Sequence, residues 1–249
     1  MKKILATIGL LLTFNTLPVR ADKFLSKQPT VPAYSLAAMG CMILRECTEG
    51  VEQLTPESTL ISGKEFDAFR EEIKSILIGL DKLGVPVYVG PSRYFTPRTV
   101  GLYKPEYNRF FVNEELLKDP REFLGTLRHE GWHTVQDCMG GGLQTSFMAQ
   151  VHQDSEIPAW VMKMTKLSYE SMGQGRAVPW EADANWAEEQ SNVTAEKLEM
   201  CAKGSLWDQI KPTPMTMEWL IGCGWMKPQE GYKEYVPNKK AQYCVEGKF

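Results

Sequence analysis

The stretch that decides the fold is His129-Glu130-Gly131-Trp132-His133, in a chain that contains only three histidines. On an α-helix, residues four apart project from the same face, because four residues make slightly more than one turn. Both imidazoles would then point to one side, with Glu130 between them in sequence. This spacing suits two ligands of a tetrahedral Zn²⁺ ion, and Glu130 could act on a water at the metal. The alternative is a chance match on an exposed helix face.

The residues around this stretch predict a long helix. Asp119 suits the N-cap, Pro120 the first helical position and Glu122 the third, and Gly140-Gly141-Gly142 suits the end. A stripe recurs at helical spacing on the side roughly opposite the two histidines: Leu124, Leu127, Gly131, Val135 and Cys138. We therefore expect the stripe to dock on the core while both histidines face a cleft.

A zinc hydrolase needs a third protein ligand and an open coordination position. The part of the chain after His133 contains four candidates for that ligand: His152, Glu181, Asp183 and Glu188. Glu181 is favoured because it lies in a helix-like run from Pro179 to Ala187, and a helix that crosses behind the first could present it to the metal. The alternative for Glu181 is a solvated helix carboxylate.

Together these two motifs resemble those of the gluzincin metallopeptidases, and more distantly the branch that includes the HtpX and CAAX-processing proteases. In that branch the third ligand is the first Glu of a Glu-x-Glu-Ala-Asp run. On this chain the resemblance implies Glu181 as that ligand, with Asp183 as the second acid and Asn185 in place of the final Asp. The two departures affect the hydrogen bonds around the ligands rather than the ligand itself.

The resemblance covers about residues 119–201 and implies a zincin-like fold and a zinc-dependent peptidase. Its metal ligands would be His129, His133 and Glu181, and Glu130 would be the catalytic general base. The oxyanion that develops in such a reaction also needs a hydrogen-bond donor beyond the metal. The candidates are His152, Tyr169, Arg176 and Tyr232, and the sequence does not choose among them. An ordinary surface or loop histidine is the alternative for His152.

Two short strands are predicted ahead of the central helix, over residues 99–103 and 109–113, with a turn over 104–108. One of them could pair its backbone with an extended peptide substrate. An ordinary hairpin that only covers the core is the alternative.

Two further helices and one further strand are expected. A helix capped by Ser62 and Glu65 is expected over residues 62–84, followed by a buried strand over 85–90. Another helix is expected over 155–172. On this last helix we expect four residues to face the core: Trp160, Val161, Met164 and Leu167.

The N-terminus predicts a signal peptide over residues 1–21. Met1-Lys2-Lys3 is a basic start, residues 4–14 are apolar, and Val19-Arg20-Ala21 is a small-x-small cleavage pattern. The apolar stretch is too short to span a bilayer, although an uncleaved anchor is the alternative. We therefore expect a secreted or periplasmic protein without stable membrane association after cleavage.

Six cysteines in an exported chain predict disulfides. Spacing favours Cys41–Cys47 and Cys223–Cys244 as local pairs, which leaves Cys138–Cys201. An unbroken helix from Pro179 would hold Cys201 about 30 Å from Glu181, too far for this third pair. A helix break near Ser191-Asn192 would remove the conflict.

The chain has 249 residues and a net charge of −3, which argues against nucleic acid or an anionic membrane as partner. Residues 22–249 are expected to form a single α+β domain, mainly helical, with a small antiparallel sheet ahead of the active-site helix and an irregular, disulfide-stapled C-terminal region. The predicted function is an exported zinc metallopeptidase that acts on peptides or proteins. The alternatives are a non-catalytic zinc-binding protein and a zinc amidase that acts on cell-wall peptides.

Overall fold

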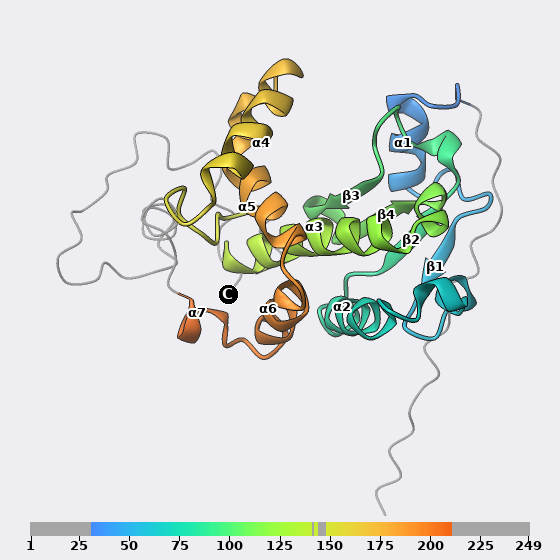
Figure 1. Cartoon of the computed structure of the whole chain (residues 1–249). Helices are drawn as coiled ribbons and strands as arrows, with labels where there is room; N and C mark the ends of the chain where they lie inside the picture. The colour runs from blue at the N-terminus through green and yellow to red at the C-terminus, as the bar shows by residue number, and fades with distance from the viewer. Residues whose placement is uncertain (1–30, 141, 144–147, 211–249) are drawn as a thin grey trace, which may run out of the picture.

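The computed structural model describes residues 31–140, 142–143 and 148–210 (Figure 1). The predicted signal peptide, Tyr232, the Cys223–Cys244 pair and the predicted C-terminal region beyond residue 210 lie outside the described residues. Within them the protein is α+β and mainly helical, as the sequence predicted. The helices are α1 Leu36–Ile43, α2 Arg70–Lys82, α3 Pro120–Met139, α4 Ala159–Ser171, α5 Val178–Glu188, α6 Val193–Ala202 and α7 Leu206–Gln209.

Four short strands form one sheet in the order β1-β2-β4-β3. The strands are β1 Glu52–Leu54, β2 Val87–Gly90, β3 Gly101–Lys104 and β4 Arg109–Asn113. The expected hairpin is confirmed, because β3 pairs antiparallel with β4. The sheet is mixed rather than wholly antiparallel, since β2 and β4 run parallel. This parallel pair arises because the antiparallel strand β3 lies between β2 and β4 in sequence but outside them in the sheet.

Both faces of the sheet are covered, which explains the buried residues on alternating sides of its strands. Val87, Val89, Phe110 and Val112 join the main core with α2, α3 and α6. Tyr88 and Phe111 point the other way, stack at 5.5 Å between ring centroids, and join a second cluster with α1. Tyr103 of β3 belongs to the main core and therefore faces α3.

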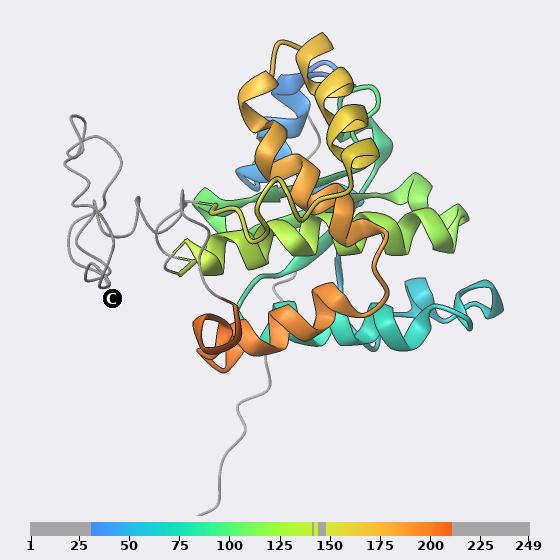
Figure 2. The same ribbon diagram turned by 60° about the vertical axis from the view of Figure 1, so that its left-hand side comes forward.

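Helix α3 is the centre of the fold, with α4 and α5 on one side and α2 and α6 on the other (Figures 1 and 2). Its start follows the sequence prediction: the Asp119 carboxylate accepts hydrogen bonds from the backbone N–H groups of Arg121 and Glu122, and Pro120 occupies the first turn. The predicted stripe is confirmed at Leu124, Leu127 and Val135, which are fully or almost fully buried.

Two sequence predictions about helices are wrong. Helix α2 begins at Arg70 rather than at residue 62, because the Ser62 hydroxyl donates to the Thr59 carbonyl in the preceding turn instead of capping the helix. Helix α4 buries Val161 and Thr165, while three residues expected in the core are 57–61% exposed: Trp160, Met164 and Leu167. Among the described helices, α4 packs chiefly on α5, and most of its residues are exposed.

Two predicted disulfides are present, Cys41–Cys47 and Cys138–Cys201. The second is possible because α5 ends at Glu188 and α6 begins at Val193, with Asn192 in the left-handed region (φ 63°) between them. The break that this pair requires is thus present. Disulfides are typical of an oxidising, exported environment. Among the described helices, none has the length and apolar character that crossing a membrane requires.

Candidate metal centre

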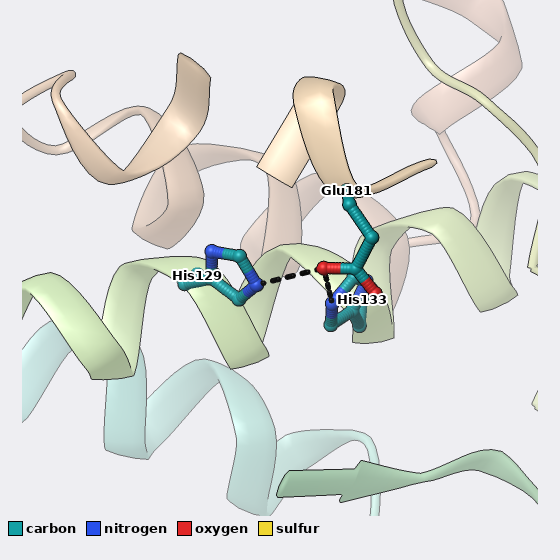
Figure 3. Close-up of side chains that lie close together, drawn as sticks. All are labelled: His129, His133 and Glu181. Atoms are coloured by element: carbon teal, nitrogen blue, oxygen red, sulfur yellow. Dashed lines mark ion pairs between the residues drawn. The ribbon is translucent and has the colours of Figure 1, made fainter. Parts of the chain in front are cut away.

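The two central helices bring His129, His133 and Glu181 together (Figure 3). Both histidines project from α3 and Glu181 projects from α5, which packs along α3. One ligand atom from each residue lies within 4.8 Å of the other two. Oε2 of Glu181 is 3.3 Å from Nε2 of His129 and 3.6 Å from Nε2 of His133. Of the four candidates for the third ligand, the structure thus brings Glu181 to the histidines.

The outer ring nitrogen of each histidine has a partner of its own. Nδ1 of His129 lies 3.3 Å from Oε2 of Glu188, and Nδ1 of His133 lies 2.8 Å from Oε1 of Gln136. In this arrangement both Nδ1 atoms carry the proton and donate it. Once any proton on Nε2 is lost, each Nε2 presents a lone pair toward Glu181, which is the tautomer that a metal ligand needs.

Two imidazole lone pairs and a carboxylate that face one another repel unless a cation lies between them. In the metal-free protein that cation is a proton. Burial lowers the pKa of His129, but the hydrogen bonds to Glu181 and Glu188 outweigh burial and raise it to about 10. Burial raises the pKa of Glu181, yet the two histidines hold it far below its ordinary value. A divalent cation would satisfy all three groups, and two nitrogens with one oxygen form a ligand set that Zn²⁺ accepts.

Asp183, another candidate for the third ligand, lies behind the site and is fully buried. Its Oδ2 accepts hydrogen bonds from Nε2 of Gln136 at 3.0 Å and from the backbone N–H of Val151 at 2.8 Å. Its Oδ1 lies 2.8 Å from Nδ1 of His152. The same Gln136 accepts a hydrogen bond from His133. Asp183 therefore orients the amide that holds His133 and is not itself one of the candidate ligands.

Asn185 does not take the supporting role that the resemblance implied. Its Nδ2 donates to Oγ1 of Thr165 at 2.7 Å and so ties α5 to α4. The Asn185 amide therefore makes a contact between these two helices rather than a hydrogen bond to one of the three candidate ligands.

Glu130 lies beside the ligand set but is not part of it. Its Oε2 accepts a hydrogen bond of 2.7 Å from the backbone N–H of Tyr103 in β3. The strand comes this close because Gly101 has no side chain: a Cβ there would lie 2.8 Å from Cγ of Glu130 and 2.4 Å from Cγ2 of Thr126. Glu130 is thus held by the strand, outside the three candidate ligands, while its charge acts on His129.

Of the proposed oxyanion donors, Tyr169 contacts the ligand set. Its hydroxyl donates to Oε2 of Glu181 at 2.6 Å from the far end of α4. Burial, and then the charge of Glu181, raise the pKa of Tyr169, so its hydroxyl keeps its proton at neutral pH. Arg176 is exposed in a turn between α4 and α5. His152 is held by Asp183 and stacks on Trp132, with 5.5 Å between ring centroids.

Gln136 and Tyr103 are the residues at the site that the sequence analysis did not identify. Gln136 lies three residues after His133, a spacing that places the two side chains on one helix face, so helical periodicity could have pointed to it. Tyr103 was assigned to the correct strand, but no pattern in the sequence shows which helix residue an outward-facing backbone N–H will meet.

Comparisons of the chain with protein-family models, with curated proteins and with solved structures found no match.

Proposed function

We propose that the protein is an exported zinc-dependent metallopeptidase with a zincin-like fold. The observation that carries this proposal is the pairing of two features on α3. His129 and His133 meet Glu181 through their inner nitrogens, while Glu130 lies outside this group but close enough for its charge to raise the pKa of His129. A purely structural zinc site is usually closed by four protein ligands and has no use for a base beside it.

When bound, zinc supplies a Lewis acid that polarises a carbonyl group and acidifies water. Glu130 takes the proton of the attacking water and passes it to the leaving amine. One of its oxygens is held by Tyr103, so the carboxylate is oriented before substrate arrives. The Tyr169 hydroxyl has one proton, which it donates to Glu181 in the free protein, so it would have to turn from Glu181 to donate a hydrogen bond to the oxyanion that develops on the scissile carbonyl.

Strand β3 supports a peptide as the substrate. It is the outermost strand of the described sheet, with β4 as its only neighbouring strand there. It also contacts α3 directly at Glu130. The outward N–H of Tyr103 is bonded to Glu130, so a peptide that adds to this edge would pair with the other outward backbone groups of β3 and would lie beside the general base, whichever side chains it carries.

The test begins with zinc content by mass spectrometry on protein purified from an oxidising compartment. We expect about one zinc ion per native chain, and strong loss of zinc in His133→Ala and Glu181→Ala. Glu130→Gln should keep its zinc and lose cleavage of a peptide library by at least about 100-fold.

Glu122→Gln is the matched control, because this exposed glutamate lies on the same helix, in its first turn. It should keep both zinc and activity. A native chain that binds no zinc would overturn the metal centre. A Glu130→Gln enzyme that cleaves peptides at the native rate would leave the metal and remove the mechanism.

A further inference from the structure

The proposed general base is connected to a buried acid that the mechanism does not use. Asp137 lies on α3 two helical turns beyond Glu130, so both side chains project from the same side of the helix. Asp137 is fully buried in the main core, and its Oδ2 accepts a hydrogen bond of 2.7 Å from the Tyr103 hydroxyl. The backbone N–H of the same Tyr103 donates to Glu130. One residue of β3 thus bridges two carboxylates of α3.

Tyr103 is held to α3 at two points, its backbone N–H and its side-chain hydroxyl. The Tyr103 side chain is 5% exposed and lies within the main core, so its ring holds the backbone against α3. Its hydroxyl is also 3.2 Å from Oδ1 of Asn108 in the hairpin turn, but the contact with Asp137 is the shorter. At Gly101, two residues earlier, the strand has no side chain to hold it away from Glu130.

A buried carboxyl is costly, which makes this contact informative. Burial raises the pKa of Asp137 to about 7, while the Tyr103 hydroxyl counteracts that rise. Its second oxygen, Oδ1, is buried and without a hydrogen-bond partner among the described residues. An apolar residue would fill this position in the core at lower cost, so the acid has value chiefly through its contact with Tyr103.

We propose that Tyr103 and Asp137 are positioning residues for Glu130: Asp137 anchors the Tyr103 side chain, and the anchored strand holds its N–H on the Glu130 carboxylate. The proposal rests on the proposed function, because it assigns to Glu130 the role of base. Catalysis is sensitive to such orientation, since a small displacement of a catalytic group lowers the rate far more than it lowers binding.

The test compares Tyr103→Phe and Asp137→Asn in the full-length, zinc-loaded protein. Tyr103→Phe keeps the ring and loses the anchor, so kcat on a peptide cleaved by the native enzyme should fall about 10-fold, with KM and zinc content unchanged. Asn at position 137 can still accept from the Tyr103 hydroxyl, so Asp137→Asn should retain kcat within about 3-fold. Tyr107→Phe is the control, because Tyr107 is an exposed tyrosine in the same hairpin and should be neutral.

A second readout does not depend on activity. In an NMR spectrum, the amide proton of residue 103 should show the downfield chemical shift and slow hydrogen exchange of an N–H bonded to a carboxylate. Glu130→Ala should abolish both. Tyr103→Phe should move this signal part of the way toward its position in Glu130→Ala, and Tyr107→Phe should leave it in place.

The two readouts separate failure of the positioning role from failure of the proposed function. A native protein without zinc or peptidase activity would overturn the enzyme and with it the assignment of a base. An active enzyme in which Tyr103→Phe keeps the native kcat and the native amide signal would overturn the positioning role alone.

Discussion

Glu188 lies 3.3 Å from Nδ1 of His129, two helical turns along α5 from Glu181, which faces Nε2 of the same ring. One helix therefore supplies both the candidate third ligand and the carboxylate that sets the tautomer of a candidate first ligand. Such supporting carboxylates raise the basicity of a metal-bound imidazole and hold its plane.

Replacing Glu188 with Ala should weaken zinc binding by about 10- to 100-fold without removing any ligand. The measurement is a competition titration against a chromophoric zinc chelator. Glu189→Ala is the matched control, because Glu189 is the exposed next residue on the chain and should leave the affinity unchanged. Equal affinities in the two variants would show that Glu188 is only a surface acid.

Gln136 connects His133 to the buried Asp183, so Gln136→Met should affect both the metal and the core. Met has a similar volume but makes none of the three hydrogen bonds of Gln136, so Asp183 and the Trp180 carbonyl would each lose a donor. We expect the free energy of unfolding to fall by about 1–3 kcal/mol and zinc to bind more weakly. Urea denaturation with and without zinc measures both effects. A variant with native stability would mean that water replaces the amide.

Zinc binding should release protons at pH 8. In the metal-free protein the pKa of His129 is raised from 6.5 to about 10, so at pH 8 its ring still carries the extra proton that zinc must displace. Isothermal titration of zinc in buffers of different ionisation enthalpy counts the released protons. We expect close to one proton per zinc from His129, and a smaller number as the pH approaches 10. Zinc binding at pH 8 without proton release would contradict the raised pKa.

The same shift determines how the stability of the metal-free protein depends on pH. Because the pKa of His129 is higher in the folded state than in the unfolded state, its stabilising contribution is complete below pH 6.5 and is lost as the pH rises through about 10. Stability measured by denaturation should therefore decline over this range without zinc, and should decline less with zinc bound.

The sequence predicted the parts of the fold that depend on local rules. The start of α3 at Asp119-Pro120, the stripe that faces the core and the hairpin follow from capping, periodicity and turn signals, whereas the break before α6 was only a condition for the Cys138–Cys201 pair. The candidate ligands were predictable for a related reason: His129 and His133 share a helix face, and Glu181 was the favoured carboxylate in the helix-like run from Pro179 to Ala187, which could cross that face.

The remaining features depend on which elements meet, and local rules do not specify this. Trp160, Met164 and Leu167 form an apolar stripe of the kind that normally faces a core, yet α4 turns this stripe to the outside. The roles of Asp183 and Glu188 depend on the exact rotation of α5 against α3. This rotation brings Glu188 to Nδ1 of His129 and Asp183 to the Gln136 amide. The contact between Tyr103 and Glu130 requires the strand and the helix to approach within hydrogen-bonding distance.

The two disulfides give a final prediction, because they close loops of very different length. Cys138–Cys201 joins residues 63 apart at the ends of α3 and α6, whereas Cys41–Cys47 joins residues 6 apart. From loop-closure entropy alone, the long loop is worth about 4 kcal/mol and the short one about 2 kcal/mol. The double variant Cys138→Ala/Cys201→Ala should therefore lose more stability in urea denaturation than Cys41→Ala/Cys47→Ala.

The long-loop variant should also bind zinc more weakly, because the disulfide joins the helix that carries both histidines to the helix that follows Glu181 in sequence. The short-loop variant is the control and should keep its zinc affinity, since Cys41 and Cys47 lie in the second cluster with α1. Equal losses of stability and equal losses of zinc affinity in the two variants would contradict a specific role of Cys138–Cys201 in the packing of α3 on α6.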